Sequence, residues 1–170
     1  MRKLQIVCAL MFVAALMVST SYGQAGFVER SSPVTEGAVT LVYDPADGSY
    51  TVNGGGVKIS TWEHKDQEGR LTGACVDGSL GGLFDVCSAD KLFKLDPAGW
   101  GDGPDGHYFG NLLPAGMDFA GINAVGAIGG SVLPSGGLPD VGVFVVPEPS
   151  SMALMGLGLL GLLGIRRKRS

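Results

Sequence analysis

The central part of the chain, 24–145, is rich in glycine and lacks any long stretch with helical spacing. Of its 122 residues, 24 are glycine, which loses more conformational freedom than other residues when a helix or strand fixes its backbone. No run of ten or more residues repeats apolar side chains at helical intervals. Short β-rich runs bounded by Gly, Pro, Asp and Asn recur instead. These patterns predict an all-β domain.

The β-rich runs predict nine short strands, spaced by roughly 8 to 12 residues, as in a sandwich or barrel. The connections between them are too short for helical crossovers, so antiparallel pairing is expected. We therefore predict an antiparallel β-sandwich. The expected strands are 38–43, 49–53, 57–62, 71–76, 83–87, 91–95, 107–113, 123–128 and 138–146.

The chain opens with a cationic and then an apolar segment. Arg2 and Lys3 precede an apolar stretch from Leu4 to Val18, and small polar residues follow it. This order is typical of a secretory signal peptide, and about 15 apolar residues are fewer than the ~20 that span a bilayer. We expect a signal peptide at 1–23 that is cleaved before Gln24. The alternative is an N-terminal membrane anchor.

The last 25 residues combine an extended motif, an uncharged segment and a basic cluster. Two prolines around one Glu favour an exposed, extended chain. The uncharged segment, 152–165, would rise about 21 Å as a helix, whereas a bilayer core is about 30 Å thick. The four cations after it favour a membrane helix, because such residues stay on the cytoplasmic side. The motif is Pro147, Glu148 and Pro149, and the basic cluster is Arg166, Arg167, Lys168 and Arg169.

These three features, in this order at the end of an exported chain, resemble the PEP-CTERM sorting signal. That family occurs on exported proteins of Gram-negative bacteria that make extracellular polysaccharide. The resemblance covers 146–170 and implies that Pro147, Glu148 and Pro149 are recognised by an exosortase, a membrane-embedded enzyme that processes the tail. It also implies export machinery as a partner, an inner-membrane intermediate, and a final place at the cell surface or outside the cell. A C-terminal anchor that is never cut is the alternative.

Charge and cysteine content narrow the function of the exported domain, 24–145. It has 6 Lys and Arg against 15 Asp and Glu, a net charge of −9, which argues against a nucleic-acid partner. Cys75 and Cys87 are the two cysteines that follow the signal peptide. In an exported domain such a pair favours a disulfide, with free thiols or part of a metal site as alternatives.

Metal and cofactor signals are weak, and we expect neither a cofactor nor a catalytic metal. Gly101, Gly103 and Gly106 match a dinucleotide-binding spacing but lack its strand-and-helix context, so we expect a loop. Several Asp residues in Gly-rich turns offer oxygen ligands of the kind that Ca²⁺ takes. Bonding of each Asp to its own turn is the alternative. The Asp residues concerned are Asp44, Asp47, Asp96, Asp102 and Asp105.

No catalytic motif stands out, so we expect a non-catalytic protein of the cell surface or extracellular matrix. His64 lies among charged residues and is predicted to be solvated. One alternative is a carbohydrate-binding module for extracellular polysaccharide that presents Trp100, Tyr108 and Phe109 on a flat face. Core packing of these aromatic residues is the competing expectation. A second alternative is a secreted polysaccharide hydrolase that uses His107 or paired Asp side chains.

Overall fold

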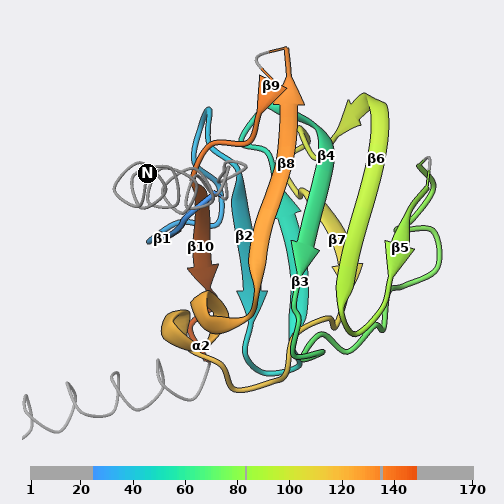
Figure 1. The fold of residues 1–170 in the computed structure, drawn as a ribbon. Helices are drawn as coiled ribbons and strands as arrows, with labels where there is room; N and C mark the ends of the chain where they lie inside the picture. Colours follow the sequence, from blue (N-terminus) through green and yellow to red (C-terminus); the bar gives the residue numbers. More distant parts are fainter. Residues whose placement is uncertain (1–24, 83, 135, 149–170) are drawn as a thin grey trace, which may run out of the picture.

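Two five-stranded sheets lie face to face, as Figure 1 shows in a computed structural model that describes residues 25–82, 84–134 and 136–148. The first sheet has the order β1-β10-β2-β3-β7, and the second has the order β5-β6-β4-β8-β9. A two-layer, all-β architecture is therefore confirmed. The strands are β1 Phe27–Glu29, β2 Thr40–Asp44, β3 Ser49–Asn53, β4 Lys58–Lys65, β5 Val86–Cys87, β6 Lys91–Trp100, β7 His107–Gly110, β8 Ala127–Leu133, β9 Gly136–Gly137 and β10 Val141–Val145, and the helix is α2 Phe119–Ala124.

The prediction of purely antiparallel pairing is wrong for the first sheet. Strand β10 pairs in parallel with β1 on one side and with β2 on the other. Short connections exclude parallel pairing only between strands that are neighbours in the sequence. Here the last strand of the domain inserts between the first two, so all elements from β3 to β9 lie in the connection from β2 to β10. The remaining pairs of named strands in both sheets are antiparallel.

Most predicted strands exist, with changed ends. Strand β3 has the predicted bounds, and β2, β4, β5, β6, β7 and β10 overlap their predicted ranges. The strand predicted at 71–76 is wrong, because only Cys75 forms an isolated bridge, to Gly110. The short strands β1 and β9 were not predicted.

The strand predicted at 123–128 is also wrong. The chain forms the single-turn helix α2 there, and β8 begins only at Ala127. Asp118 caps this helix, because its side chain accepts the backbone N–H of Gly121 at 2.8 Å. Six helical residues are too few to show a helical apolar period, so the sequence pattern resembled a strand.

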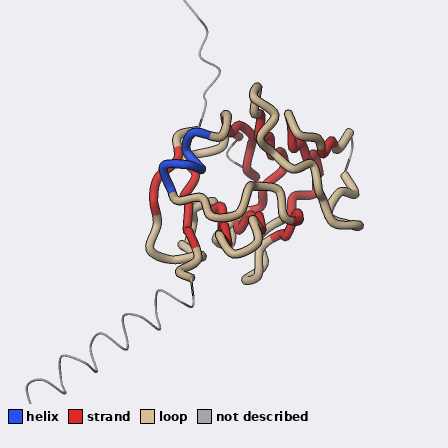
Figure 2. Tube along the Cα trace, turned by 90° about the horizontal axis from the view of Figure 1, so that it is seen from below, coloured by secondary structure: helices blue, strands red, loops and turns tan. Residues whose placement is uncertain are grey.

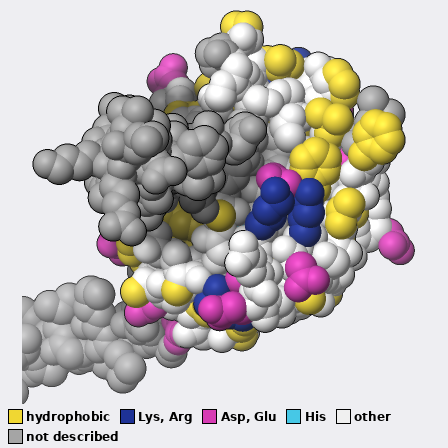
Figure 3. Space-filling view, in the orientation of Figure 1, with side chains coloured by type: hydrophobic (Ala, Val, Ile, Leu, Met, Phe, Trp, Pro, Cys, Tyr) yellow, Lys and Arg dark blue, Asp and Glu magenta, His cyan; other side chains and the backbone are white. Residues whose placement is uncertain are grey.

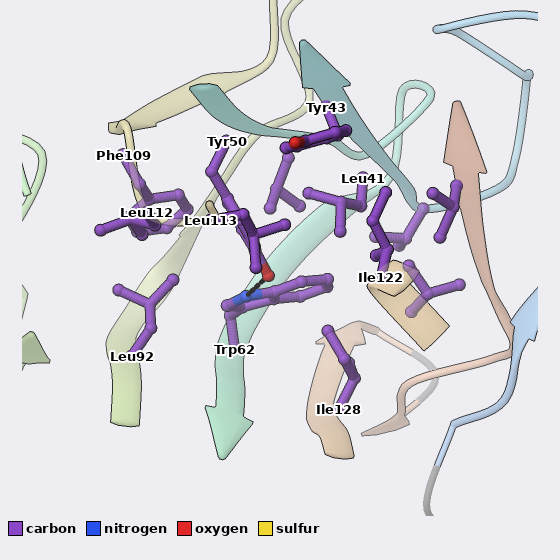
Figure 4. Close-up of a cluster of buried hydrophobic side chains, with 14 of the residues drawn as sticks. Leu41, Tyr43, Tyr50, Trp62, Leu92, Phe109, Leu112, Leu113, Ile122 and Ile128 are labelled. Atoms are coloured by element: carbon purple, nitrogen blue, oxygen red, sulfur yellow. Dashed lines mark hydrogen bonds between the residues drawn. The ribbon is translucent and has the colours of Figure 1, made fainter. Parts of the chain in front are cut away.

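The core lies between the sheets and is built around aromatic side chains (Figure 4). Tyr50 from β3 and Trp62 from β4 are fully buried, with ring centroids 6.4 Å apart in an edge-to-face arrangement. Tyr50 also meets Phe109 from β7 at 6.0 Å. Aliphatic side chains from both sheets, from the loop after β7 and from α2 surround these rings, including Leu41, Leu92, Leu112, Leu113, Ile122 and Ile128.

A chain of buried hydrogen bonds joins the two sheets through this core. Trp62 Nε1–H donates to the hydroxyl of Tyr50 at 3.2 Å, and that hydroxyl lies 3.0 Å from Nδ1 of His64. His64 Nε2 lies 2.6 Å from the carbonyl oxygen of Val125. A neutral His64 satisfies every group, because Nε2–H donates to the carbonyl and Nδ1 accepts from Tyr50. The prediction of a solvated His64 is wrong, since this side chain is fully buried.

We expect the domain to lose stability as the pH falls from 7 to 5. Burial lowers the pKa of His64, although the bond to Val125 and the charge of Asp66 act in the opposite direction. The unfolded chain keeps the ordinary pKa of about 6.5. The contribution of His64 is therefore complete above that pH and is lost as the pH falls through it, because the unfolded state binds the extra proton.

The urea midpoint at pH 7 and at pH 5 measures this effect. His107 also has a pKa lowered by burial, but it is only partly buried. The control His107→Gln should therefore keep most of the pH dependence. Equal midpoints at the two pH values in the unmodified protein would contradict the assignment.

The outer face of the second sheet mixes apolar and charged side chains. Figure 3 shows apolar side chains gathered over β5 and β6 beside a group of cationic and acidic ones. Val86 is 40% exposed, and Phe84, just before β5, is 83% exposed. Next to them, Glu63 forms ion pairs with Lys65 at 3.0 Å and with Lys91 at 2.7 Å. Ion pairs that are only partly buried, such as these, contribute little to stability.

Candidate functional site

The predicted sorting motif begins where the last strand ends. Val145 of β10 is aligned with Tyr43 of β2, and the N–H of Val146 donates to the carbonyl oxygen of Tyr43 at 2.8 Å. Pro147 and Glu148 follow directly and are exposed. Proline has no backbone N–H, so it cannot continue the ladder. The fold therefore holds the chain firmly up to Val146 and presents the motif without a spacer.

The side chain of Tyr43 connects this exit to the neighbouring loop. Its hydroxyl donates to the carbonyl oxygen of Pro114 at 2.5 Å and accepts the N–H of Met117 at 3.1 Å. The N–H of Gly116 donates to the carbonyl oxygen of Pro45 at 2.8 Å. Burial raises the pKa of Tyr43, so the hydroxyl keeps its proton for the bond to Pro114. One tyrosine thus fixes both the end of β10 and the loop beside it.

The other parts of the predicted export and sorting signals lie outside the described residues. These are the signal peptide at 1–23, Pro149, the helix at 152–165 and the basic cluster at 166–169. Within 25–148, apart from 83 and 135, no helix is long and apolar enough to cross a membrane. Of the Pro-Glu-Pro motif, the structure therefore describes the first two residues, Pro147 and Glu148.

The structure contains the predicted disulfide between Cys75 and Cys87. It closes a loop that covers one open side of the sandwich, where β6 and β7 lie. This loop carries Ser79 and Asp85, whose oxygen atoms meet side chains from β6 and β7. The disulfide therefore ties a surface loop to groups in the interior.

Beneath this loop lies a cluster of polar side chains that sequence reasoning missed. Lys94, which is 5% exposed, donates from Nζ to the carbonyl oxygen of Ser79 at 3.3 Å and lies 3.7 Å from Oδ2 of Asp85. His107 donates from Nε2 to the same carbonyl at 2.8 Å. Burial alone would raise the pKa of Asp85, but backbone N–H groups, including that of Leu95, outweigh it and lower the pKa. The charged groups are thus held by structural bonds.

Removal of the disulfide is expected to lower the free energy of unfolding by about 3 kcal/mol, since the loop it closes has about 13 residues. The variant Cys75→Ser/Cys87→Ser tests this by urea denaturation. Reductant should bring the unmodified protein to the same midpoint and leave the double variant unchanged. A double variant as stable as the oxidised protein would contradict the prediction.

A cleft of about 420 Å³ lies at the end of β4, next to the turn between α2 and β8. One wall is an ion pair in which the guanidinium of Arg70 binds Asp66 through Nε at 3.0 Å and Nη2 at 2.8 Å. Nη2 also donates to the carbonyl oxygen of Ala124, and Nη1 pairs with Glu68 at 3.3 Å. The bonds from Arg70 hold the pKa of Asp66 well below its usual range. Because Arg70 is engaged with the protein itself, this wall has a structural role.

The aromatic residues of the carbohydrate-binding alternative do not form one exposed face. Trp100 is 7% exposed and Phe109 is fully buried. Both pack in the core, as the alternative expectation of core packing predicted for them. Tyr108 is 44% exposed, and its hydroxyl donates to the side chain of Asn111 at 2.6 Å. Their burial counts against a sugar-stacking face made of these three residues.

Three of the five acidic turn residues, Asp44, Asp47 and Asp96, bond the backbone of their own turn, whereas Asp102 and Asp105, which the structure also describes, do not. Asp44 accepts the N–H of Ala46, and Asp96 accepts that of Ala98, each at 2.9 Å. Among the described residues no group of three or more His, Cys, Asp or Glu side chains is arranged to hold a metal ion. The segment 101–106 joins β6 to β7 and is followed by a strand, so it lacks the helix that a dinucleotide site needs.

Comparison with known proteins identifies the C-terminal motif. Residues 145–169 match the family model of the PEP-CTERM protein-sorting motif. No curated protein and no solved structure matches the chain. The chain thus carries a PEP-CTERM signal, which indicates an exported protein that an exosortase sorts to the cell envelope or surface.

Proposed function

We propose that this protein is a non-catalytic component of the cell surface or extracellular matrix, delivered by its signal peptide and released from its C-terminal tail by an exosortase. The observation that carries the proposal is the position of the motif directly after β10. Every strand of the described domain precedes Val146. Removal of the tail therefore leaves both sheets complete, as a sorting reaction on a folded cargo requires.

The non-catalytic part of the proposal is supported by how the two histidines are used. His64 is fully buried and bonded within the core, and His107 is bonded to the carbonyl oxygen of Ser79. Side chains that hold the fold in this way are not poised to bind a substrate. The carbohydrate-binding alternative retains Tyr108 as the exposed member of its three aromatic residues, and we do not propose it.

Intact mass of the mature protein from its native host tests the proposal, measured separately in membrane and medium. We expect a chain that begins at Gln24 and ends near Pro149, without the segment 152–170. A chain that ends at Ser170 and is confined to the membrane would contradict processing. The C-terminal segment would then be a membrane anchor that is never cut.

A further inference from the structure

Loops and the helix α2 form the end of the sandwich from which β10 exits (Figure 2). Two segments flank Val146 there, the turn 44–48 and the segment 111–124, which includes α2; we call them the exit rim. Tyr43 binds the second segment through Pro114 and Met117 and accepts the N–H of Val146. Figure 2 looks onto this end and shows α2 and long loops there. The exit rim therefore lies at the same end of the sandwich as the motif, on the side of β10 away from Arg30, whose N–H donates to the carbonyl oxygen of Val143.

The exit rim contains no cationic residue, and three of its 19 residues are acidic. The segment 111–124 contains no Lys or Arg, and Asp118 is its one acidic residue. Its exposed residues include Pro114, Ala115, Gly116 and Ala120. The three carboxylates of the rim each accept a local backbone N–H, at 2.8–2.9 Å, so each already has a hydrogen-bond partner within the protein. They are Asp44, Asp47 and Asp118.

The length of the chain keeps this surface close to the membrane before processing. This restraint rests on the proposed function and on the membrane helix expected at 152–165. From Glu148 to Met152 the chain advances four residues, which reach at most about 14 Å when fully extended. Since Val146 is bonded to Tyr43, no flexible spacer can carry the domain farther away.

The shortness of the predicted membrane helix strengthens this restraint. Fourteen uncharged residues rise about 21 Å, which is about 9 Å less than the hydrocarbon core. A short span is accommodated by thinning of the bilayer and by drawing its flanking residues toward the membrane. On the outer side these flanking residues are the motif and then the exit rim.

We propose that the exit rim is a membrane-facing surface, which lies in the headgroup region of the bilayer while the tail is attached. The small and apolar residues of the segment 111–124 enter this region at low cost, and the three carboxylates of the rim keep their backbone hydrogen bonds there. The rim has no cationic cluster to hold anionic lipids. Contact therefore depends on the tail and ends when the tail is removed, which suits a protein that leaves the membrane after processing.

Quenching of tryptophan fluorescence by brominated lipids tests the proposal on the exported chain with its tail, reconstituted in phosphatidylcholine vesicles. The probe is Ala115→Trp on the rim. The matched control is Gly103→Trp, in the exposed loop 101–106 at the opposite end of the sandwich, where a side chain meets no neighbouring atoms. Trp62 and Trp100 are buried and give both variants the same background. We expect quenching of the first variant and not of the second.

Sedimentation with the vesicles, measured in parallel, separates the rim from the tail. Vesicle-bound protein with selective quenching of Ala115→Trp supports the proposal. Vesicle-bound protein in which both variants, or neither, are quenched overturns the membrane-facing rim and leaves the anchoring tail intact. Protein that stays in the supernatant overturns both the anchoring tail and the rim surface.

Discussion

Replacement of Trp62 by alanine is expected to lower the free energy of unfolding of the domain by about 3–5 kcal/mol. The side chain is fully buried between the sheets and meets the ring of Tyr50 edge to face. Truncation leaves a cavity and removes the Nε1–H that donates to Tyr50. A domain of this size is stable by about 5–15 kcal/mol, so this loss is a large fraction of the total.

Urea denaturation of Trp62→Ala and of a matched exposed variant measures the effect. Phe84→Ala is the control, because Phe84 is also aromatic but 83% exposed. Its free energy of unfolding should stay within about 0.5 kcal/mol of the unmodified protein. If Trp62→Ala unfolded at the same urea concentration as this control, the assigned core would be wrong.

Residues with a strong local pattern allowed the strands to be predicted. The run 49–53, bounded by the turn residues Gly48 and Gly54, predicted β3 with its observed bounds. Strand alternation contained a signal for the buried histidine, because Trp62 and His64 are two residues apart and therefore share a face of β4. The charged neighbours Glu63 and Lys65 point to the other face. The charged composition of the segment masked this signal.

Features that depend on distant parts of the chain could not be predicted in this way. The place of β10 between β1 and β2 depends on pairing across more than one hundred residues of sequence, for which no local residue type is diagnostic. The polar cluster of Lys94, Asp85 and His107 is likewise assembled from a loop and two strands. The sorting motif is local and was predicted, whereas its bond to Tyr43 became evident only in the structure.

Alanine at all three positions of the motif, Pro147, Glu148 and Pro149, is expected to abolish removal of the tail. The prolines restrict the backbone and remove its donors, and Glu148 adds a single charge between them; alanine removes all three features. Pro147 and Glu148 are exposed, so the urea midpoint should change only within the range of surface substitutions. Intact mass should show a chain that ends at Ser170.

A second proline–acid pair in the chain provides the control for this experiment. Pro104 and Asp105 lie exposed in the loop between β6 and β7, at the end of the sandwich opposite to the exit rim. The variant Pro104→Ala/Asp105→Ala removes the same kinds of side chain and should be processed like the unmodified protein. If the triple variant also lost its tail at the normal rate, recognition would not depend on these residues. If both variants kept the tail, the effect would come from general loss of export and not from the motif.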